Sequence, residues 1–151
     1  MYILLFLMIL LTDQLTKLWA LMELSDHVID VANWFNLSLT YNKGVSFSFL
    51  TNDNMYMPFV LSGVALIIVL FLYLWFRKEH RFLTRLGLVF MMGGAISNVI
   101  DRLYLGSVVD FIDWHIGVYH WPAFNIADSF ICLGVFLLIM QFIFEKKENK
   151  Q

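Results

Sequence analysis

Four carboxylates lie in or beside segments of this chain that are apolar enough to enter a bilayer: Asp13, Asp101, Asp110 and Asp128. A charge at that depth is disfavoured by roughly 2.5–3.5 kcal/mol on insertion scales, so an ionisable residue there usually has a function. Two carboxylates that share one site do not easily both ionise, and such a pair supplies a general base and a general acid. It can activate water for amide hydrolysis without a serine or cysteine nucleophile. We expect Asp110 and Asp128 to meet at one membrane surface as a pair of this kind.

Both acids also have a simpler, structural interpretation. Asn125 and Asp128 stand three residues apart at the start of an apolar segment, which is the pattern of a helix capping box, and a carboxylate there favours the helix dipole. Asp110 lies within the apolar sequence Val108–Ile112 and can be structural if it pairs with Arg102. The presence of further polar residues at the same expected depth favours the functional interpretation.

Asp13 and Lys17 are spaced i,i+4 on the first apolar segment, so they share one face of a helix. This spacing by itself favours a neutralised ion pair near the membrane surface. The functional alternative is a carboxylate that orients another group of the site.

Gly94, Asn98 and Arg102 follow at i,i+4 steps on the third apolar segment, with Asp101 beside them. Glycine permits the close approach of two membrane helices. Asn98 can serve as an interhelical hydrogen-bonding residue, and Arg102 can extend to the interface. Alternatively, the rigid guanidinium of Arg102 holds a carbonyl or a carboxylate of a substrate. The spacing does not decide between these roles.

The composition indicates one integral membrane domain over residues 1–151. The chain is 60% hydrophobic and only 15% charged, more apolar than a soluble domain of this length. No basic patch with interleaved aromatic residues is present, which argues against nucleic-acid binding. Cys132 is the only cysteine, which excludes an internal disulfide and a cysteine-based metal cluster, and the four histidines show no metal-ligand spacing. We expect no metal and no cofactor.

Four apolar segments are long enough to cross a hydrocarbon core of about 30 Å as helices. The first lacks a basic region before it and a small-residue cleavage site after it, so we interpret it as a retained helix rather than a signal peptide. Seven of the ten basic residues fall in the loop 77–85 and in the tail 145–151. The positive-inside rule makes that side cytoplasmic, together with both termini. The expected transmembrane helices are 2–22, 58–76, 82–100 and 124–144.

The outer loop between the first two segments, roughly 27–50, has the alternation of a β-strand. Apolar and polar residues alternate over 35–42 and again over 45–49, on either side of Lys43 and Gly44. Two such runs around a short glycine-containing turn predict a β-hairpin, which can cradle an extended peptide or a lipid. The second outer loop, 102–123, has no pattern that assigns its structure. The expected fold is thus an all-α membrane protein with four transmembrane helices, a small extracytoplasmic antiparallel β-hairpin or cradle, and an outer loop.

Five motifs in this order resemble those of bacterial lipoprotein signal peptidase (signal peptidase II), a family of membrane aspartyl endopeptidases. Each motif is weak alone, but their order and the four-helix topology together are specific, and the resemblance covers nearly the whole chain. The motifs are Asp13–Lys17 (DQLTK), Asn42–Phe47 (NKGVSF), Gly94–Arg102 (GAISNVIDR), Val109–Ile112 (VDFI) and Pro122–Asp128 (PAFNIAD).

The resemblance implies an enzyme of the bacterial inner membrane, with its active site near the extracytoplasmic face. It would cleave prolipoproteins on the N-terminal side of a cysteine that carries a diacylglyceryl group. We also expect the protein to contact membrane lipid and to be a monomer. Asp110 and Asp128 would be the catalytic pair. The resemblance gives supporting roles to other motif residues: Asn98, Arg102 and Asn125 in substrate binding and transition-state stabilisation, and Asp13, Asn42, Gly44 and Asp101 in shaping the pocket. We expect Lys17 to be a further supporting residue of the site.

Two positions depart from the family pattern. Ser46 stands where a small apolar residue is usual, and Ser97 stands where glycine is common. Both serines are small, so we expect effects on substrate preference rather than on activity.

Two other functions are compatible with a small apolar chain. A proton-coupled transporter or channel subunit would use Asp13, Asp101 and Asp128 as a relay, but it needs acids spread through the membrane depth. A structural assembly protein explains the apolar helices but not several polar clusters at one level.

Overall fold

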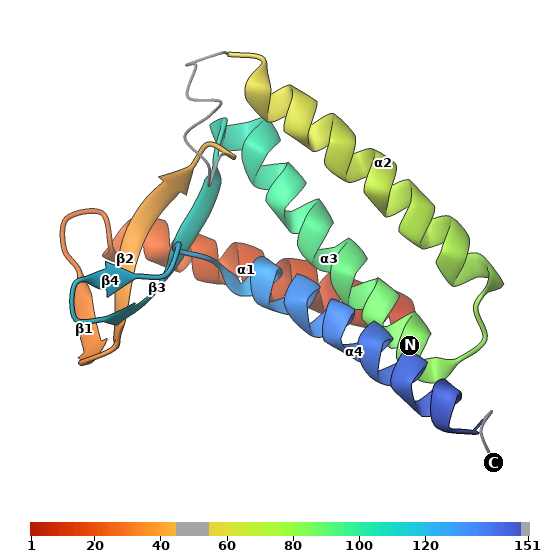
Figure 1. The fold of residues 1–151 in the computed structure, drawn as a ribbon. Coiled ribbons are helices and arrows are strands. Elements are labelled where there is room, and N and C mark those ends of the chain that lie inside the picture. Colours follow the sequence, from red (N-terminus) through yellow and green to blue (C-terminus); the bar gives the residue numbers. More distant parts are fainter. Residues whose placement is uncertain (45–54, 149–151) are drawn as a thin grey trace.

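The computed structural model describes residues 1–44 and 55–148 and contains four helices that are long and apolar enough to cross a membrane (Figure 1). This confirms the predicted number of transmembrane helices. The third helix continues five residues beyond the predicted end at residue 100, so Asp101 and Arg102 are helical. The helices are α1 (Tyr2–Glu23), α2 (Met57–Lys78), α3 (Phe82–Leu105) and α4 (Ile126–Glu148).

Helix α3 is the centre of the bundle and packs against α1, α2 and α4. In its most apolar stretch 56% of the residues are buried, against 22% in α1 and 11% in both α2 and α4. The other three helices therefore direct most of their apolar side chains outward, as expected for helices that contact lipid. A group positioned on α3 is accordingly held from several sides.

Gly94 allows α3 and α4 to approach closely at the level of the predicted site. A Cβ atom at this position would lie 2.4 Å from the backbone carbonyl oxygen of Ala127 and 2.8 Å from a side-chain carbon of Ile131. Any larger residue would push the two helices apart. The small-residue contact expected between membrane helices is therefore present, and it sets the distance between Asn98 on α3 and the start of α4.

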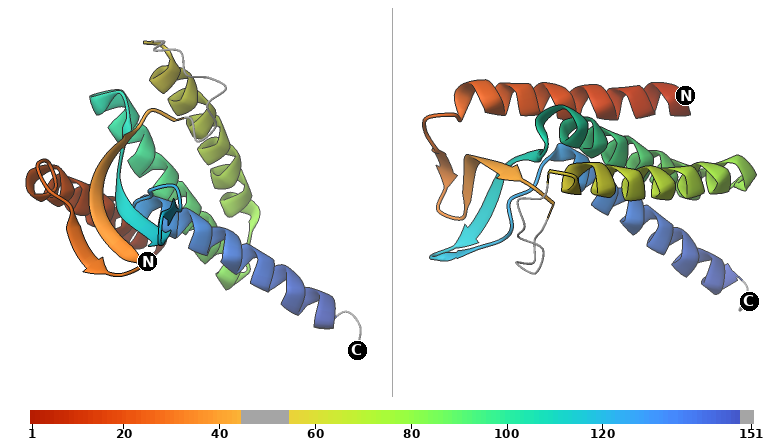
Figure 2. Two further views of the ribbon diagram at one scale, coloured as in Figure 1. Left: turned by 60° about the vertical axis from the view of Figure 1, so that its left-hand side comes forward. Right: turned by 90° about the horizontal axis from the view of Figure 1, so that it is seen from above.

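A four-stranded antiparallel sheet lies at the end of the bundle opposite the two termini (Figures 1 and 2). The predicted strand over 35–42 is confirmed as β2. The described strands that pair with it are β1 and a strand in the loop that the sequence left unassigned, whereas the predicted strand over 45–49 lies outside the described residues and stays a prediction. The strands follow the order β1 (Ile29–Ala32), β2 (Phe35–Asn42), β3 (Val108–Ile116) and β4 (Tyr119–His120).

The register of β2 and β3 brings two distant parts of the chain together. Asn42 is opposite Val108, and Thr40 is opposite Asp110. On its other side β3 is bonded to the segment before α4, because the Phe111 N–H donates to the Phe124 carbonyl at 3.1 Å and the Phe124 N–H donates back to Ile112 at 3.1 Å. The sheet therefore places Asp110 between the end of β2 and the beginning of α4.

An ion-pair cluster holds the helix ends at the opposite side of the bundle. One Glu79 carboxylate oxygen accepts from the backbone N–H groups of His80 and Arg81 and from the Arg81 Nε, each at 2.9 Å. The bond from Arg81 lowers the pKa of Glu79 to about 2. Arg81 also pairs with Glu145 of α4. These contacts connect the α2–α3 loop to the last turns of α4.

Candidate active site

The two acids predicted as a pair lie on different elements but share one neighbour, Asn125. Asp110 is a buried residue of β3, 1% exposed, and Asp128 lies in the first turn of α4. The Asn125 side-chain amide donates to Asp110 Oδ1 at 2.7 Å, and the Asn125 backbone N–H donates to Asp128 Oδ2 at 3.3 Å. The structure thus brings both carboxylates to one residue at the junction of the sheet and the helices.

Each remaining carboxylate oxygen of the pair also accepts an amide hydrogen. Asn42 at the end of β2 donates to Asp110 Oδ2 at 2.9 Å, and Asn98 of α3 donates to Asp128 Oδ1 at 2.8 Å. Four amide donors from β2, α3 and the α4 N-terminus therefore fix both carboxyl groups. Both oxygens of Asp110 accept from asparagines rather than from Arg102, so the proposed structural pairing of Asp110 with Arg102 is not what holds this acid.

The capping interpretation of Asn125 and Asp128 is also correct. Asn125 Oδ1 accepts the Asp128 N–H at 2.9 Å while the Asp128 carboxylate accepts the Asn125 N–H, which is the reciprocal pattern of a capping box. Asn125 is fully buried. The same two residues thus begin α4 and fix the acid pair, so the structural and functional interpretations are compatible.

Burial raises the pKa of Asp110 from 3.8 to about 6. The hydrogen bond from Asn42 opposes this effect, and the nearby charge of Asp128 adds to it. A carboxyl group with this pKa exchanges its proton close to neutral pH, which is what general acid–base chemistry requires.

The raised pKa of Asp110 predicts how stability depends on pH. Because the folded-state pKa lies above the unfolded one, the protonated carboxyl favours the folded protein; this contribution is complete below about pH 4 and lost as the pH rises through about 6. The side chain at position 110 does not titrate in an Asp110→Asn variant. The melting temperature of the wild-type protein relative to this variant should therefore fall as the pH rises from about 4 to about 6. Thermal unfolding in detergent at a series of pH values measures the difference, and a difference that stays constant with pH would contradict the raised pKa.

Lys17 connects the acid pair to two further carboxylates. Its ammonium group lies 2.7 Å from Asp13 Oδ2 and 2.8 Å from Asp101 Oδ2, and it donates to Asn98 Oδ1 at 2.9 Å. The predicted ion pair of Asp13 and Lys17 is therefore present, although both residues are buried in the bundle. Three acceptors match the three donors of an ammonium group.

Asp13 and Asp101 also hold backbone groups next to the acid pair. Asp13 Oδ1 accepts the Ala127 N–H at 2.6 Å, so a carboxylate from α1 caps the N-terminus of α4. Asp101 Oδ2 accepts the Val109 N–H at 3.1 Å. Both interpretations of Asp13 thus hold, since it forms an ion pair and orients another element.

Arg102 and Gly44 lie beside the acids without bonding to them directly. The Arg102 guanidinium is near enough to Asp128 and Asp110 to interact with their charges. Its Nε is buried and has no hydrogen-bond partner within the part of the chain that the structure describes. Gly44 has φ +98°, and a Cβ atom there would lie 2.1 Å from a methyl carbon of Leu61 and 3.9 Å from Arg102 Nε. The positive φ favours glycine at this position, whereas the Leu61 methyl group is the end of a flexible side chain that can move.

All ten predicted site residues contribute to this one region. Two further residues, Gln14 and Ser97, belong to its hydrogen-bonding network and were not predicted as site residues. Both are polar residues inside predicted membrane spans, which is the signal that marks them. Within residues 1–44 and 55–148, no group of three or more His, Cys, Asp and Glu side chains is arranged to hold a metal ion.

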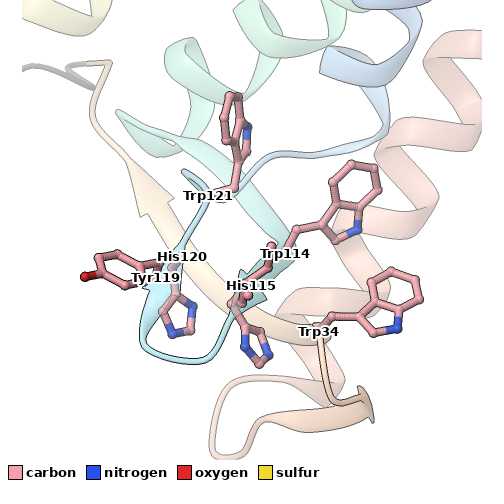
Figure 3. A pocket seen from close by; sticks show the side chains of 7 residues that line it. Trp34, Trp114, His115, Tyr119, His120 and Trp121 are labelled. Atoms are coloured by element: carbon pink, nitrogen blue, oxygen red, sulfur yellow. The ribbon is translucent and has the colours of Figure 1, made fainter.

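A separate pocket of about 570 Å³ lies among aromatic residues of the sheet and contains none of the predicted site residues (Figure 3). Figure 3 shows the side chains of Trp34, Trp114 and Trp121 on neighbouring segments of the sheet region, close to His115 and His120. The size of this pocket does not make it the candidate active site, because Asp110 and Asp128, whose carboxylates accept the amide hydrogen bonds described above, do not line it. The pocket is lined by Trp34, Trp114, His115, Ile116, Tyr119, His120 and Trp121.

The fold and the site define a multi-pass membrane protein with buried acids at the junction of four helices and a sheet. Two experimental structures share this fold. One, titled "Bacterial membrane enzyme structure by the in meso method at 2.3 A resolution", aligns with a TM-score of 0.78 at 29% identity, over 99% of this chain and 91% of that one. A second, at 1.9 Å resolution, aligns with a TM-score of 0.75 at 30% identity, over 93% of this chain and 91% of that one.

Sequence comparison identifies the family. The family model described as "Signal peptidase (SPase) II" matches residues 5–144. A lipoprotein signal peptidase of Coxiella burnetii (strain RSA 331 / Henzerling II) is 40% identical over 90% of this chain and 85% of its own length. One from Burkholderia thailandensis is 43% identical over 88% of this chain and 81% of its own length. The chain belongs to the signal peptidase II family and is a peptidase, which confirms the resemblance of its motifs.

Proposed function

We propose that this protein removes signal peptides from prolipoproteins by aspartate-dependent hydrolysis, with Asp110 and Asp128 as the catalytic pair. Its relatives' names supply the substrate class. The observation that supports the catalytic pair is the shared contact with Asn125, which donates to one carboxylate oxygen of each acid. The transporter alternative has no such support, because all four membrane-associated acids gather in one hydrogen-bonded region.

In the proposed mechanism, the ionised carboxylate of the pair takes a proton from a water molecule, and the resulting hydroxide attacks the scissile carbonyl carbon. The protonated partner donates a hydrogen bond to the developing oxyanion. When the C–N bond breaks, the pair delivers a proton to the leaving amine. The asparagines that hold all four carboxylate oxygens keep both acids oriented through these transfers.

Arg102 is suited to bind the substrate. Its buried Nε has no partner among the described residues, and it lies 3.9 Å from the position that a Cβ atom at residue 44 would occupy. A guanidinium N–H donated to a substrate carbonyl would fix the scissile bond relative to the acids. Removal of one donor that stabilises an oxyanion costs about 2.7–4 kcal/mol in well-studied enzymes.

The membrane supplies the remaining positioning. By the positive-inside rule, the basic loop 77–85 and the basic tail favour cytoplasmic termini, which supports an extracytoplasmic position for the sheet and the acids. The signal helix and the diacylglyceryl group of a precursor both partition into the bilayer, which confines the search to two dimensions. Cleavage then falls on the N-terminal side of the lipid-modified cysteine, and one copy of the chain is sufficient.

A cleavage assay tests this proposal. Purified protein in detergent, incubated with a diacylglyceryl-modified prolipoprotein, should convert it to a smaller product that begins with the lipid-modified cysteine. The unmodified precursor is the matched substrate control and should stay intact. Failure to cleave the modified precursor, or cleavage at another bond, would refute the proposed function.

A further inference from the structure

We infer that Ser97 and Gln14 are positioning residues that set the geometry of the two catalytic acids. The inference rests on the proposed role of Asp110 and Asp128. Neither Ser97 nor Gln14 touches these acids. They act through Asp13 and Asp101, the two buried carboxylates that hold the backbone on either side of the site.

The first connection runs from Ser97 to Asp128. Ser97 is fully buried on α3, and its hydroxyl donates to Asp13 Oδ2 at 2.7 Å. The other oxygen of Asp13 accepts the N–H of Ala127, the residue that directly precedes Asp128. The hydroxyl therefore fixes the orientation of the carboxylate that anchors the first turn of α4.

The second connection runs from Gln14 to Asp110. The Gln14 side-chain amide donates to Asp101 Oδ1 at 2.8 Å. The other oxygen of Asp101 accepts the N–H of Val109, which directly precedes Asp110. Each catalytic acid thus follows a residue whose backbone N–H is held by a buried carboxylate from a transmembrane helix.

Gln14 and Ser97 also join the two connections. The Gln14 amide donates to the Ser97 hydroxyl at 3.0 Å, and Lys17 bonds both Asp13 and Asp101. A change in either carboxylate is therefore passed to the other. A displacement of about 1 Å in an active site can cost 10²-fold in rate. The contact of Ser97 with Asp13 therefore revises the expectation from the sequence that Ser97 affects substrate preference: its hydroxyl is expected to affect catalysis rather than substrate binding.

Ser97→Ala is the direct test, and Ser62→Ala is its matched control. Both serines are buried in helices, but the hydroxyl of Ser62 has no hydrogen-bond partner in the described part of the chain. With the diacylglyceryl-modified precursor, Ser97→Ala should lower kcat roughly tenfold with KM within about twofold of wild type, whereas Ser62→Ala should keep both. Ser97→Thr, which retains the hydroxyl, should recover kcat if melting temperatures show that all variants are folded at the assay temperature.

The pH dependence of kcat in a Gln14→Glu variant is a measurement that a purely structural role of Gln14 would leave unchanged. Gln14 is half-buried and, with Lys17 and Asp101, lines a groove of about 360 Å³ between α1 and α3, so a side chain of equal size fits there. A protonated glutamic acid can donate to Asp101, whereas an ionised one repels Asp101 and Asp13. The kcat of this variant relative to wild type should be highest at acidic pH and fall as the pH rises.

Two results would overturn the inference: kcat of Ser97→Ala equal to that of Ser62→Ala, or a ratio of Gln14→Glu to wild type that is constant with pH. These outcomes are distinct from a failure of the proposed function, which would appear as an inactive wild-type protein or an active Asp128→Asn variant. A wild-type enzyme that cleaves, together with unaffected Ser97 and Gln14 variants, would remove only the positioning role.

Discussion

Asp110→Asn and Asp128→Asn should each abolish cleavage of the diacylglyceryl-modified precursor and leave the protein folded in the membrane. Asparagine has the shape of aspartate but neither takes a proton from water nor donates one to the leaving amine. General acid–base groups typically contribute 10²–10⁴-fold to rate, so either substitution should reduce kcat by about this factor or more. Gel electrophoresis of the precursor over time measures the loss.

Asp113→Asn is the matched control for this experiment. Asp113 lies on β3, three residues beyond Asp110, and its carboxylate bonds to His120 at 2.9 Å rather than to any residue of the acid pair. The same chemical change on the same strand should therefore preserve cleavage. Turnover at the wild-type rate in Asp110→Asn or Asp128→Asn would exclude the acid pair as the catalytic machinery.

Lys17→Met should have the largest effect on stability, because it removes the cation that Asp13 and Asp101 share. All three side chains are almost completely buried, so the two carboxylates would be left without their common counter-ion. Removal of one partner of a buried ion pair costs about 3–5 kcal/mol. For a chain of this size that corresponds to a fall of about 6–20 °C in melting temperature. Thermal unfolding of the purified protein in detergent provides the measurement.

Two companion variants identify the cause of that loss. Arg77→Met removes an exposed cation at the opposite end of the bundle and should change the melting temperature little. Asp101→Asn introduced together with Lys17→Met removes one of the unpaired charges and should recover part of the loss. An unchanged melting temperature in Lys17→Met would show that the buried carboxylates do not depend on this cation.

The helices of this protein follow from local properties of the sequence. A run of about 20 apolar residues has one stable conformation in a bilayer, so the four helices were predictable without knowledge of their neighbours. The alternation over 35–42 likewise determined a strand, because it needs only one buried face. The spacing of Asp13 and Lys17 determined their ion pair, since residues at i,i+4 meet on any helix.

Contacts between distant segments were decided only by the tertiary structure. The loop 102–123 has no clear periodicity, and β3 forms there because β2 and the segment before α4 supply its hydrogen bonds. The continuation of α3 through Asp101 and Arg102 had the same kind of cause, because packing and the bonds from Gln14 and Lys17 to Asp101 stabilise its polar last turns.

For the candidate site, the sequence by itself identified the acids that are candidates for a function. Placing a charged residue of an apolar segment in the bilayer costs free energy whichever elements the segment packs against. The sequence did not determine that Asn125 contacts both Asp110 and Asp128, or that Ser97 bonds to Asp13. Those contacts depend on the separation of α3 and α4 at Gly94 and on the register of β2 and β3. Local sequence determines which helix or strand a residue belongs to and on which face of it the residue lies. The distance between two such elements depends instead on every side chain packed between them.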